Sequence, residues 1–268
     1  MAAAGRVRSA SPDQDTFRAR LQTGFVGPAG GGAERLDRRH RFRAMEDMSK
    51  NPWPYGQATR EHIRSNLAAY SRRAVAAEGL RPAAVSVVLA PSVLESGADG
   101  ATAFLLTLRA PRLNAHAGQY ALPGGKLDPG ENALAAARRE LHEELGIEAD
   151  PEQVLGVLDD LPTRSGHLVT PFVVWLGPAA EPRPAPDEIA ELHRIPLTDL
   201  FAGRGRGANR DLAARDTSGA AVFSLYLPAL GHDLFAPTAA IMEHFREVAL
   251  EGRPTPVVRF GEPPFARR

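Results

Sequence analysis

Three glutamates stand close together near the middle of the chain, at Glu140, Glu143 and Glu144. In a helix, residues at positions i, i+3 and i+4 share one face, so these carboxylates are predicted to be neighbours. Three such charges are unfavourable together unless they are protonated or neutralised by a cation. Hard oxygen donors on a rigid helix suit Mg²⁺ or Mn²⁺, which keep positions open for water and phosphate oxygens. The spacing therefore predicts a divalent metal site, with a solvated acidic helix face as the alternative.

The residues around these glutamates can support such a site. Arg139 precedes Glu143 by four residues, which is the helical spacing for an ion pair. Glu131 falls in the first turn of the predicted helix, where the helix dipole favours an anion. Gly124 and Gly125 lie just upstream, and because they have no Cβ they let the backbone approach a metal or phosphates closely.

The stretch "GGKLDPGENALAAARRELHEELGI" at 124–147 resembles the Nudix box at every defined position. This resemblance implies an α+β protein with the Nudix fold, in which a mixed β-sheet is sandwiched between α-helices. It also implies hydrolysis of a nucleoside diphosphate linked to another group, with Mg²⁺ or Mn²⁺ as cofactor. By position in the box, the implied metal ligands are Glu140, Glu143, Glu144 and the carbonyl of Gly124, and the supporting ion-pair residues are Arg139 and Glu131.

A second resemblance lies just before the box, in "LLTLRAPRLNAHAGQYALPGG" at 105–125. It is similar to an additional signature of the coenzyme A diphosphatases within the Nudix superfamily, and it departs from that signature at Ala110 and Leu122. The likeness to this subgroup runs from about 83 to 250. It implies cleavage of coenzyme A or a derivative to 3′,5′-ADP and 4′-phosphopantetheine. The candidate substrate-binding residues are Arg109, His116, Gln119 and Lys126, each with a structural or surface role as its alternative.

Helices and strands must position these residues, and the periodicity of the chain predicts where they lie. Helices are predicted at 59–80 with Thr59 as N-cap, at 131–145 with Gly146 ending the helix, and at 237–252. Strands are predicted at 83–91, 102–109, 118–125, 153–161, 168–176, 188–197 and 221–230. Because strands and helices alternate irregularly, one mixed sheet with helices on its faces is favoured. We predict a Nudix domain at 51–252, a disordered extension at 1–50 and a tail at 253–268, with Met45 or Met48 as alternative starts.

Composition limits the partners of this chain. It has 268 residues with 32 basic and 32 acidic side chains, so no overall field draws it to nucleic acid or to an anionic membrane. The absence of cysteine excludes disulfides, thiolate nucleophiles and cysteine-ligated metals. No apolar run reaches the roughly 18 residues that span a membrane, and the N-terminus has no signal-peptide core. We therefore expect a cytoplasmic protein whose partner is a small nucleoside diphosphate compound, and we leave homodimerisation open.

Two other functions stay open at this point. The first is a Nudix hydrolase of ADP-ribose or another nucleoside diphosphate derivative, a subgroup that often has proline at the position of Pro162. The second is a catalytically silent Nudix module that binds a ligand. Such modules commonly lose carboxylates of the box, and none is lost here. Parallel turnover of coenzyme A, acyl-coenzyme A, ADP-ribose and NADH would distinguish these functions.

Overall fold

The computed structural model describes residues 51–92, 100–111, 118–177, 180–202, 214–215 and 221–259. These residues belong to one compact unit, Lys50–Arg268. The predicted disordered extension at 1–50 lies outside the described residues, so it stays a prediction. No helix among the described residues has the length and apolar character needed to cross a membrane.

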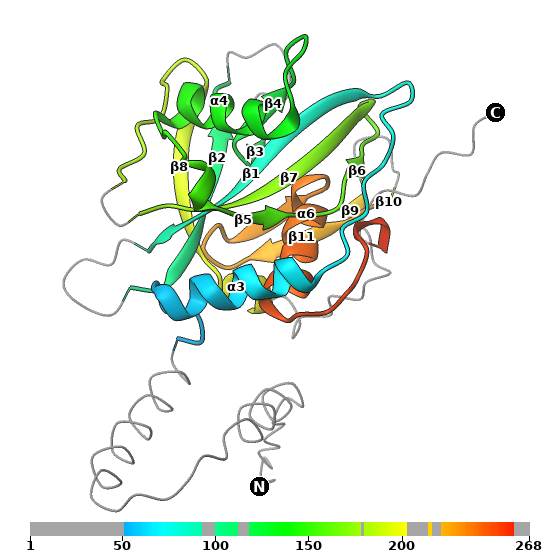
Figure 1. Cartoon of the computed structure of the whole chain (residues 1–268). Helices are drawn as coiled ribbons and strands as arrows, with labels where there is room; N and C mark the ends of the chain where they lie inside the picture. Colours follow the sequence, from blue (N-terminus) through cyan, green and yellow to red (C-terminus); the bar gives the residue numbers. More distant parts are fainter. Residues whose placement is uncertain are drawn as a thin grey trace, which may run out of the picture. The chain divides into compact units, whose positions relative to one another are not determined.

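Among the described residues, eight strands form a mixed sheet at the centre of this unit (Figure 1). Its central strand is β1 (Arg81–Pro91), which pairs antiparallel with β2 (Thr102–Arg109) and parallel with β7 (His167–Trp175). The short strand β4 (Gly124–Lys126) also pairs with β1. The remaining strands are β3 (Tyr120–Ala121) and β8 (Ile189–Pro196), which pair with β2, and β5 (Val154–Val157) and β6 (Leu161–Pro162), which pair with β7.

Helices cover both faces of this sheet. Helix α4 (Ala133–Leu145) lies on one face, and α3 (Gln57–Ala69) lies on the other with α6 (Thr238–Phe245) and its π-helical continuation η3 (Arg246–Leu250) (Figure 1). Side chains of β1 alternate between the two cores, since Val87 and Leu89 join the α3 core and Val88 and Ala90 join the α4 core. The predicted mixed sheet between helices is therefore confirmed.

Shorter elements complete the described part of the chain. Helix α5 (Asp199–Ala202) follows β8, and a hairpin of β11 (Ser224–Leu227) and β12 (His232–Phe235) precedes α6. The other short elements are η1 (Pro151–Gln153), β9 (Ala214–Arg215), β10 (Ala221–Val222) and η4 (Val257–Arg259).

The first helix is shorter than its predicted range of 59–80. Helix α3 begins after Gly56 and ends at Ala69, so the prediction of Thr59 as N-cap is wrong. Thr59 lies inside the helix, where its buried hydroxyl donates to the carbonyl of Pro54 at 2.6 Å. Tyr70 is already extended, with φ −82° and ψ 126°, and beyond it Asp159 accepts from the backbone N–H of Arg73 at 2.8 Å. Backbone groups held in this way cannot continue the helical hydrogen-bond pattern.

A buried polar cluster forms where this segment meets α6. Besides Arg73, the carboxylate of Asp159 accepts from the hydroxyl of Tyr70 at 2.9 Å and from the backbone N–H of Val257 at 3.2 Å. Nε2 of the fully buried His244 lies 3.7 Å from the same carboxylate. The cluster thus joins α3, the segment after β5, α6 and residues near 257. Burial lowers the pKa of His244 to about 4, although the charge of Asp159 opposes this effect.

This burial predicts that His244 makes the protein less stable in acid. The unfolded chain binds a proton at His244 near pH 6.5, whereas the folded protein binds it only near pH 4, so the neutral ring favours folding. The stabilisation from the neutral ring of His244 is complete above about pH 6.5 and is lost as the pH falls toward 4. Over this range the free energy of unfolding falls by up to about 1.4 kcal/mol per pH unit. Urea unfolding at several pH values in this range measures the slope.

A His244→Gln variant is the control for this prediction. It removes the titrating ring, so its free energy of unfolding should depend less steeply on pH between about 7 and 5, even if it is lower at every pH. Equal slopes for the variant and the wild type would contradict the assignment of this pH dependence to His244.

Candidate active site

Helix α4 carries the clustered glutamates and has a defined start and end. The side chain of Asn132 caps its start by accepting from the backbone N–H of Ala135 at 2.9 Å. At its end Gly146 adopts φ 63°, and its N–H donates to the carbonyl of His142 at 2.9 Å. The predicted helix end at Gly146 is confirmed. Glu131, however, precedes the cap, so the prediction that it lies in the first helical turn is wrong.

The apolar stripe of α4 determines how deeply each glutamate is buried. Leu141 and Leu145 are fully buried against the sheet. Glu144 lies in the same stripe and is only 2% exposed, and Glu140 is also largely covered. The side chain of Glu143 lies at the margin and is about half exposed. The three glutamates therefore have different environments although they are close in sequence.

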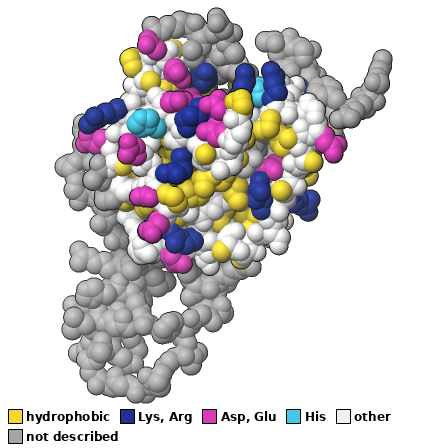
Figure 2. Space-filling model, turned by 45° about the horizontal axis from the view of Figure 1, so that its top comes forward, with side chains coloured by type: hydrophobic (Ala, Val, Ile, Leu, Met, Phe, Trp, Pro, Cys, Tyr) yellow, Lys and Arg dark blue, Asp and Glu magenta, His cyan; other side chains and the backbone are white. Residues whose placement is uncertain are grey.

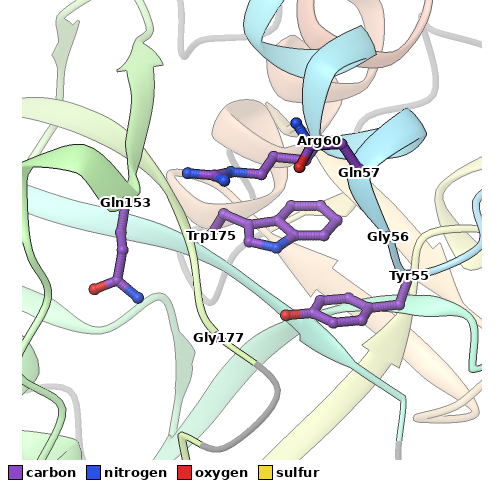
Figure 3. Close-up of a pocket in the computed structure, with 7 residues that line it drawn as sticks. All are labelled: Tyr55, Gly56, Gln57, Arg60, Gln153, Trp175 and Gly177. Atoms are coloured by element: carbon purple, nitrogen blue, oxygen red, sulfur yellow. The ribbon is translucent and has the colours of Figure 1, made fainter.

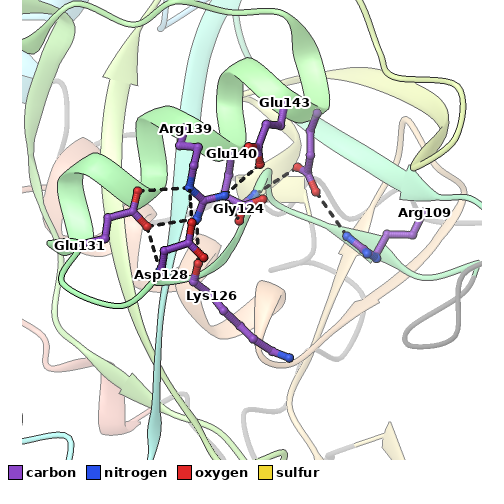
Figure 4. Close-up of polar contacts among 9 residues, drawn as sticks. Arg109, Gly124, Lys126, Asp128, Glu131, Arg139, Glu140 and Glu143 are labelled. Atoms are coloured by element: carbon purple, nitrogen blue, oxygen red, sulfur yellow. Dashed lines mark hydrogen bonds and ion pairs between the residues drawn. The ribbon is translucent and has the colours of Figure 1, made fainter.

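Arg139 binds most of the acidic groups around α4. Its Nη1 lies 2.9 Å from Glu140 and 2.8 Å from Glu143 (Figure 4). Its Nε and Nη2 each donate to Glu131 at 3.1 Å, and Nη2 also donates to the carbonyl of Lys126 at 2.9 Å. The hydrogen bond from Arg139 lowers the pKa of Glu131, and that same bond raises the pKa of Arg139. The predicted pairing of Arg139 with Glu143 and Glu131 is present in the structure.

Glu144 has separate partners. One of its oxygens accepts from the backbone N–H of Gly124 at 3.1 Å, and the other lies 3.3 Å from Nη1 of Arg109. Burial raises the pKa of Glu144 to about 7, against the opposing effects of Gly124 and Arg109, and the charges of Glu140 and Glu188 raise it further. Glu144 is therefore a carboxyl group that can gain or lose a proton near neutral pH.

The paired glycines provide space for two close approaches. At Gly124, where φ is 150°, a Cβ would lie 2.3 Å from the carbonyl oxygen of Ala84, so glycine lets β4 pack on β1. At Gly125 a Cβ would lie 2.3 Å from Oε1 of Glu140. The space beside Gly125 thus holds the carboxylate of Glu140.

The predicted substrate-binding residues have different positions. Arg109 ends β2 and faces α4, as expected from alternation with Leu105, which packs in the α4 core. Gln119 is exposed, and its carbonyl accepts from the backbone N–H of Arg109 at 3.1 Å. The exposed side chain of Lys126 extends away from the Arg139 contacts in Figure 4. His116 lies outside the described residues.

Sequence reasoning missed two acidic residues at this site. Asp128 lies 3.6 Å from Nε of Arg139 and so joins its acidic partners. Glu188 comes from the segment before β8, where its carbonyl accepts from the backbone N–H of Ala110 at 2.8 Å. Its charge raises the pKa of both Glu140 and Glu144. Neither could be found from helical spacing, because one precedes α4 and the other is distant in sequence.

The donor chemistry of this site fits a hard divalent cation. Within the described ranges no three acidic or histidine side chains converge as a metal cluster, because Glu140 and Glu143 meet on Arg139 and Glu144 contacts Arg109. Carboxylate and carbonyl oxygens are nevertheless the ligands that Mg²⁺ and Mn²⁺ prefer. Burial raises the pKa of Glu140 as well as that of Glu144. A bound cation would favour the charged forms of both carboxyl groups.

Charges of both signs gather around this part of the surface. In Figure 2, which brings the α4 side of the molecule forward, acidic and basic side chains lie next to one another and hydrophobic side chains occupy the surface beside them. The arrangement offers carboxylates for a cation together with cations for an anionic ligand.

Comparison with known proteins finds a family model and curated relatives that match this chain. The model of the NUDIX domain matches residues 81–215, or 135 of the 268 residues. "Uncharacterized Nudix hydrolase NudL" of Photorhabdus laumondii is 43% identical over 99 residues, which cover 37% of this chain and 53% of that protein. NudL of Yersinia pestis is 50% identical over 100 residues, which cover 37% and 50%. The matching part thus spans about half the length of these relatives.

Solved structures give weaker similarity. A MutT protein from Methanosarcina mazei is 22% identical and has a TM-score of 0.35, over 50% of this chain and 84% of that one. An Ap4A hydrolase from C. elegans is also 22% identical with a TM-score of 0.35, over 46% and 84%. These TM-scores are low, so family membership rests on the family model.

The contact between Gly125 and Glu140 gives a test of the site. Because a Cβ at Gly125 would overlap Oε1 of Glu140, Gly125→Ala must displace that carboxylate. We expect Mn²⁺ to bind about tenfold more weakly, as is common when the support of a metal ligand is altered. Isothermal titration calorimetry measures this affinity.

Gly100→Ala is the matched control, because its Cβ would lie 3.5 Å from the carbonyl oxygen of Ser92, an ordinary contact distance. It should bind Mn²⁺ like the wild type. Unchanged affinity in Gly125→Ala would count against Glu140 as a metal ligand.

Proposed function

The chain belongs to the Nudix family, and we propose that it hydrolyses the diphosphate of coenzyme A or a coenzyme A derivative. The products would be 3′,5′-ADP and 4′-phosphopantetheine, or its acylated form. In this reaction the oxygen of water attacks one phosphorus atom, and the bond from that phosphorus to the bridging oxygen breaks. The observation that carries the proposal is the buried Glu144, held between the amide of Gly124 and the guanidinium of Arg109.

We assign Glu140, Glu143, Glu144 and the carbonyl of Gly124 as the groups that hold Mg²⁺ or Mn²⁺. When bound, the ion would supply positive charge for the diphosphate oxygens and make water more acidic. Arg139 positions two of these carboxylates, since it contacts both Glu140 and Glu143. Glu131 in turn fixes Arg139 through two parallel hydrogen bonds.

Proton transfer from the attacking water needs a side chain that is held within hydrogen-bond reach of it. Glu144 offers a buried carboxyl group beside Gly124, whose carbonyl we assign to the cation. Its two contacts, with Gly124 and Arg109, hold the carboxyl group in one orientation. We therefore propose Glu144 as the residue that takes the proton from the attacking water in addition to its role toward the cation.

Arg109 is suited to contact the substrate. It stands at the end of β2 with Nη1 on Glu144, and its buried Nε has no hydrogen-bond partner among the described residues. A guanidinium binds phosphate oxygens through parallel N–H donors. Arg109 can thus bridge a substrate phosphate and the carboxyl group of Glu144. Gln119 supports this position through its backbone, while the roles proposed for His116 and Lys126 rest on the sequence resemblance.

The choice of coenzyme A rests on the stretch at 105–125, whose two ends the structure brings together at Glu144. The "LLTLR" end lies in β2 and includes Arg109. The "PGG" end leads into β4 and includes Gly124. The hydroxyl of Thr107 in β2 donates to the carbonyl of Ala121 in β3 at 3.0 Å, which links these two strands. The contacts of these two ends with Glu144 support the proposal that this stretch takes part in the site.

A substrate panel tests the specificity. With Mg²⁺ or Mn²⁺ present, we expect coenzyme A or an acyl-coenzyme A to be hydrolysed with a higher kcat/KM than ADP-ribose and NADH, because the 105–125 stretch resembles the coenzyme A signature and both of its ends contact Glu144. Product analysis by chromatography identifies 3′,5′-ADP directly. Much faster cleavage of ADP-ribose would favour the alternative hydrolase, and no turnover of any diphosphate would favour a ligand-binding module.

Glu144→Gln tests the catalytic assignment. The amide has nearly the same shape but neither the charge nor the ability to take up a proton, so kcat should fall by about 100-fold or more while coenzyme A still binds. Glu148→Gln is the matched control, because Glu148 is exposed and lies beyond the helix end. Near-normal kcat in Glu144→Gln would refute the role of Glu144, whatever the substrate.

A further inference from the structure

A cavity lies at the start of α3, away from the glutamates. Its volume is about 490 Å³, which is within the usual range for small-molecule sites. Its lining includes Tyr55, Gln57, Arg60, Gln153 and Trp175 (Figure 3). We propose that this cavity, here called the α3 pocket, binds a nucleotide through its planar base and its phosphate, at a site separate from the carboxylates of α4.

The register of β1 separates the α3 pocket from the glutamates. Trp175 pairs with Leu89 near one end of β1, whereas Gly124, which contacts Glu144, pairs with Val85. These positions are four residues apart on β1, or about 13 Å. Trp175 also belongs to the core on the α3 side of the sheet, while α4 packs on the other face. A ligand in the α3 pocket is thus on the opposite side of the sheet from the proposed catalytic groups.

The half-buried ring of Tyr55 provides the surface for the base, and Trp175, which is only 7% exposed, supports this ring from within the core. The rings of Tyr55 and Trp175 are stacked, with centroids 4.7 Å apart and an angle of 10° between their planes. The hydroxyl of Tyr55 donates to the carbonyl of Leu176, which fixes the orientation of its half-buried ring. Stacking on an aromatic side chain is possible for any base, because every base has a π-face. The stack therefore favours a planar ligand.

Arg60 provides the positive charge for a phosphate. Its Nη2 donates to the carbonyl of Glu152 at 3.2 Å, and its buried Nε has no hydrogen-bond partner among the described residues. In Figure 3 its guanidinium extends past the indole of Trp175 toward the side of Gln153. None of the lining residues that the structure describes has an acidic side chain. An arginine beside an aromatic surface, with no carboxylate in the lining, suits a planar anion.

Gln153 adds a directed hydrogen-bond donor. Its side-chain oxygen accepts from the backbone N–H of Asp150 at 2.7 Å, and this bond fixes which end of the amide is the nitrogen. The amide nitrogen is therefore a donor at the pocket wall, where it can bind an acceptor on a base edge. The α3 pocket thus combines a stacking surface, a base-edge donor and a phosphate-binding cation.

Calorimetry with 5′-AMP, on the full chain and without divalent ions, tests the proposal. We expect Arg60→Gln to weaken 5′-AMP binding by about tenfold or more, because it removes a charge-assisted contact to phosphate. Arg64→Gln is the matched control, since Arg64 donates to the same carbonyl of Glu152 at 3.4 Å but does not line the pocket. It should retain the wild-type affinity. Equal affinity in Arg60→Gln and the wild type, or no binding to the wild type, would overturn the proposal.

Two further comparisons locate the bound nucleotide. Glu144→Gln should bind 5′-AMP as the wild type does, whereas loss of binding in Glu144→Gln together with normal binding in Arg60→Gln would place it at α4 and refute the α3 pocket. Adenosine and inorganic phosphate should each bind more weakly than 5′-AMP. Phosphate binding as tight as that of 5′-AMP would refute the role of the aromatic stack.

A second variant covers the case in which Arg60→Gln fails to fold, as a thermal melt would show. A Cβ at Gly177 has no atom within 4 Å, so Gly177→Val places a side chain in the pocket without overlap at Cβ. It should also weaken 5′-AMP binding by about tenfold, by excluding the ligand. A folded Gly177→Val that binds 5′-AMP normally would overturn the proposal.

Discussion

The carboxylates of the candidate active site repel one another, and the site can form only if this repulsion is offset. The positive charge of the Arg139 guanidinium offsets most of it. It contacts Glu140 and Glu143 from the same helix and Glu131 from the segment before the helix. It also donates to the carbonyl of Lys126. Because these partners come from both sides of the helix start, one side chain fixes the segment from β4 to α4. Arg is suited to this position since its N–H donors point in several fixed directions.

Glu144 has partners other than Arg139, and the positions of these partners depend on the sheet. Its partners are an amide on β4 and a guanidinium at the end of β2, so both strands must be in register with β1 for the two contacts to form. Side chains alternate along a strand, so a one-residue shift of β2 would turn Arg109 to the α3 side. The buried Phe104 and Leu106 on one face, with Leu105 on the other, oppose such a shift.

Features that depend on residues close together in the sequence could be predicted, whereas features that depend on contacts between distant segments could not. The spacing of the glutamates, the pairing of Arg139 with Glu143 and the end of α4 at Gly146 all depend on residues within one or two helical turns. By contrast, α3 ends at Ala69, and the segment after it is bound through the backbone of Arg73 by Asp159, which is far along the chain. The same limit explains why Glu188 was missed, since only the fold brings its charge near α4. Glu131 shows an intermediate case, in which the predicted partner was correct and the predicted helix boundary was not.

The burial of Glu144 requires stabilisation from elsewhere in α4. A carboxyl pKa raised from 4.5 to about 7 corresponds to about 3 kcal/mol against the charged form in the folded protein. Full burial of a leucine contributes about 1.5–3 kcal/mol. Leu141 and Leu145, both fully buried on the same helix, can therefore offset this term. The apolar stripe of α4 thus holds an unfavourable carboxylate against the sheet, so a change in the packing of these leucines should affect the candidate active site as well as the stability of the fold.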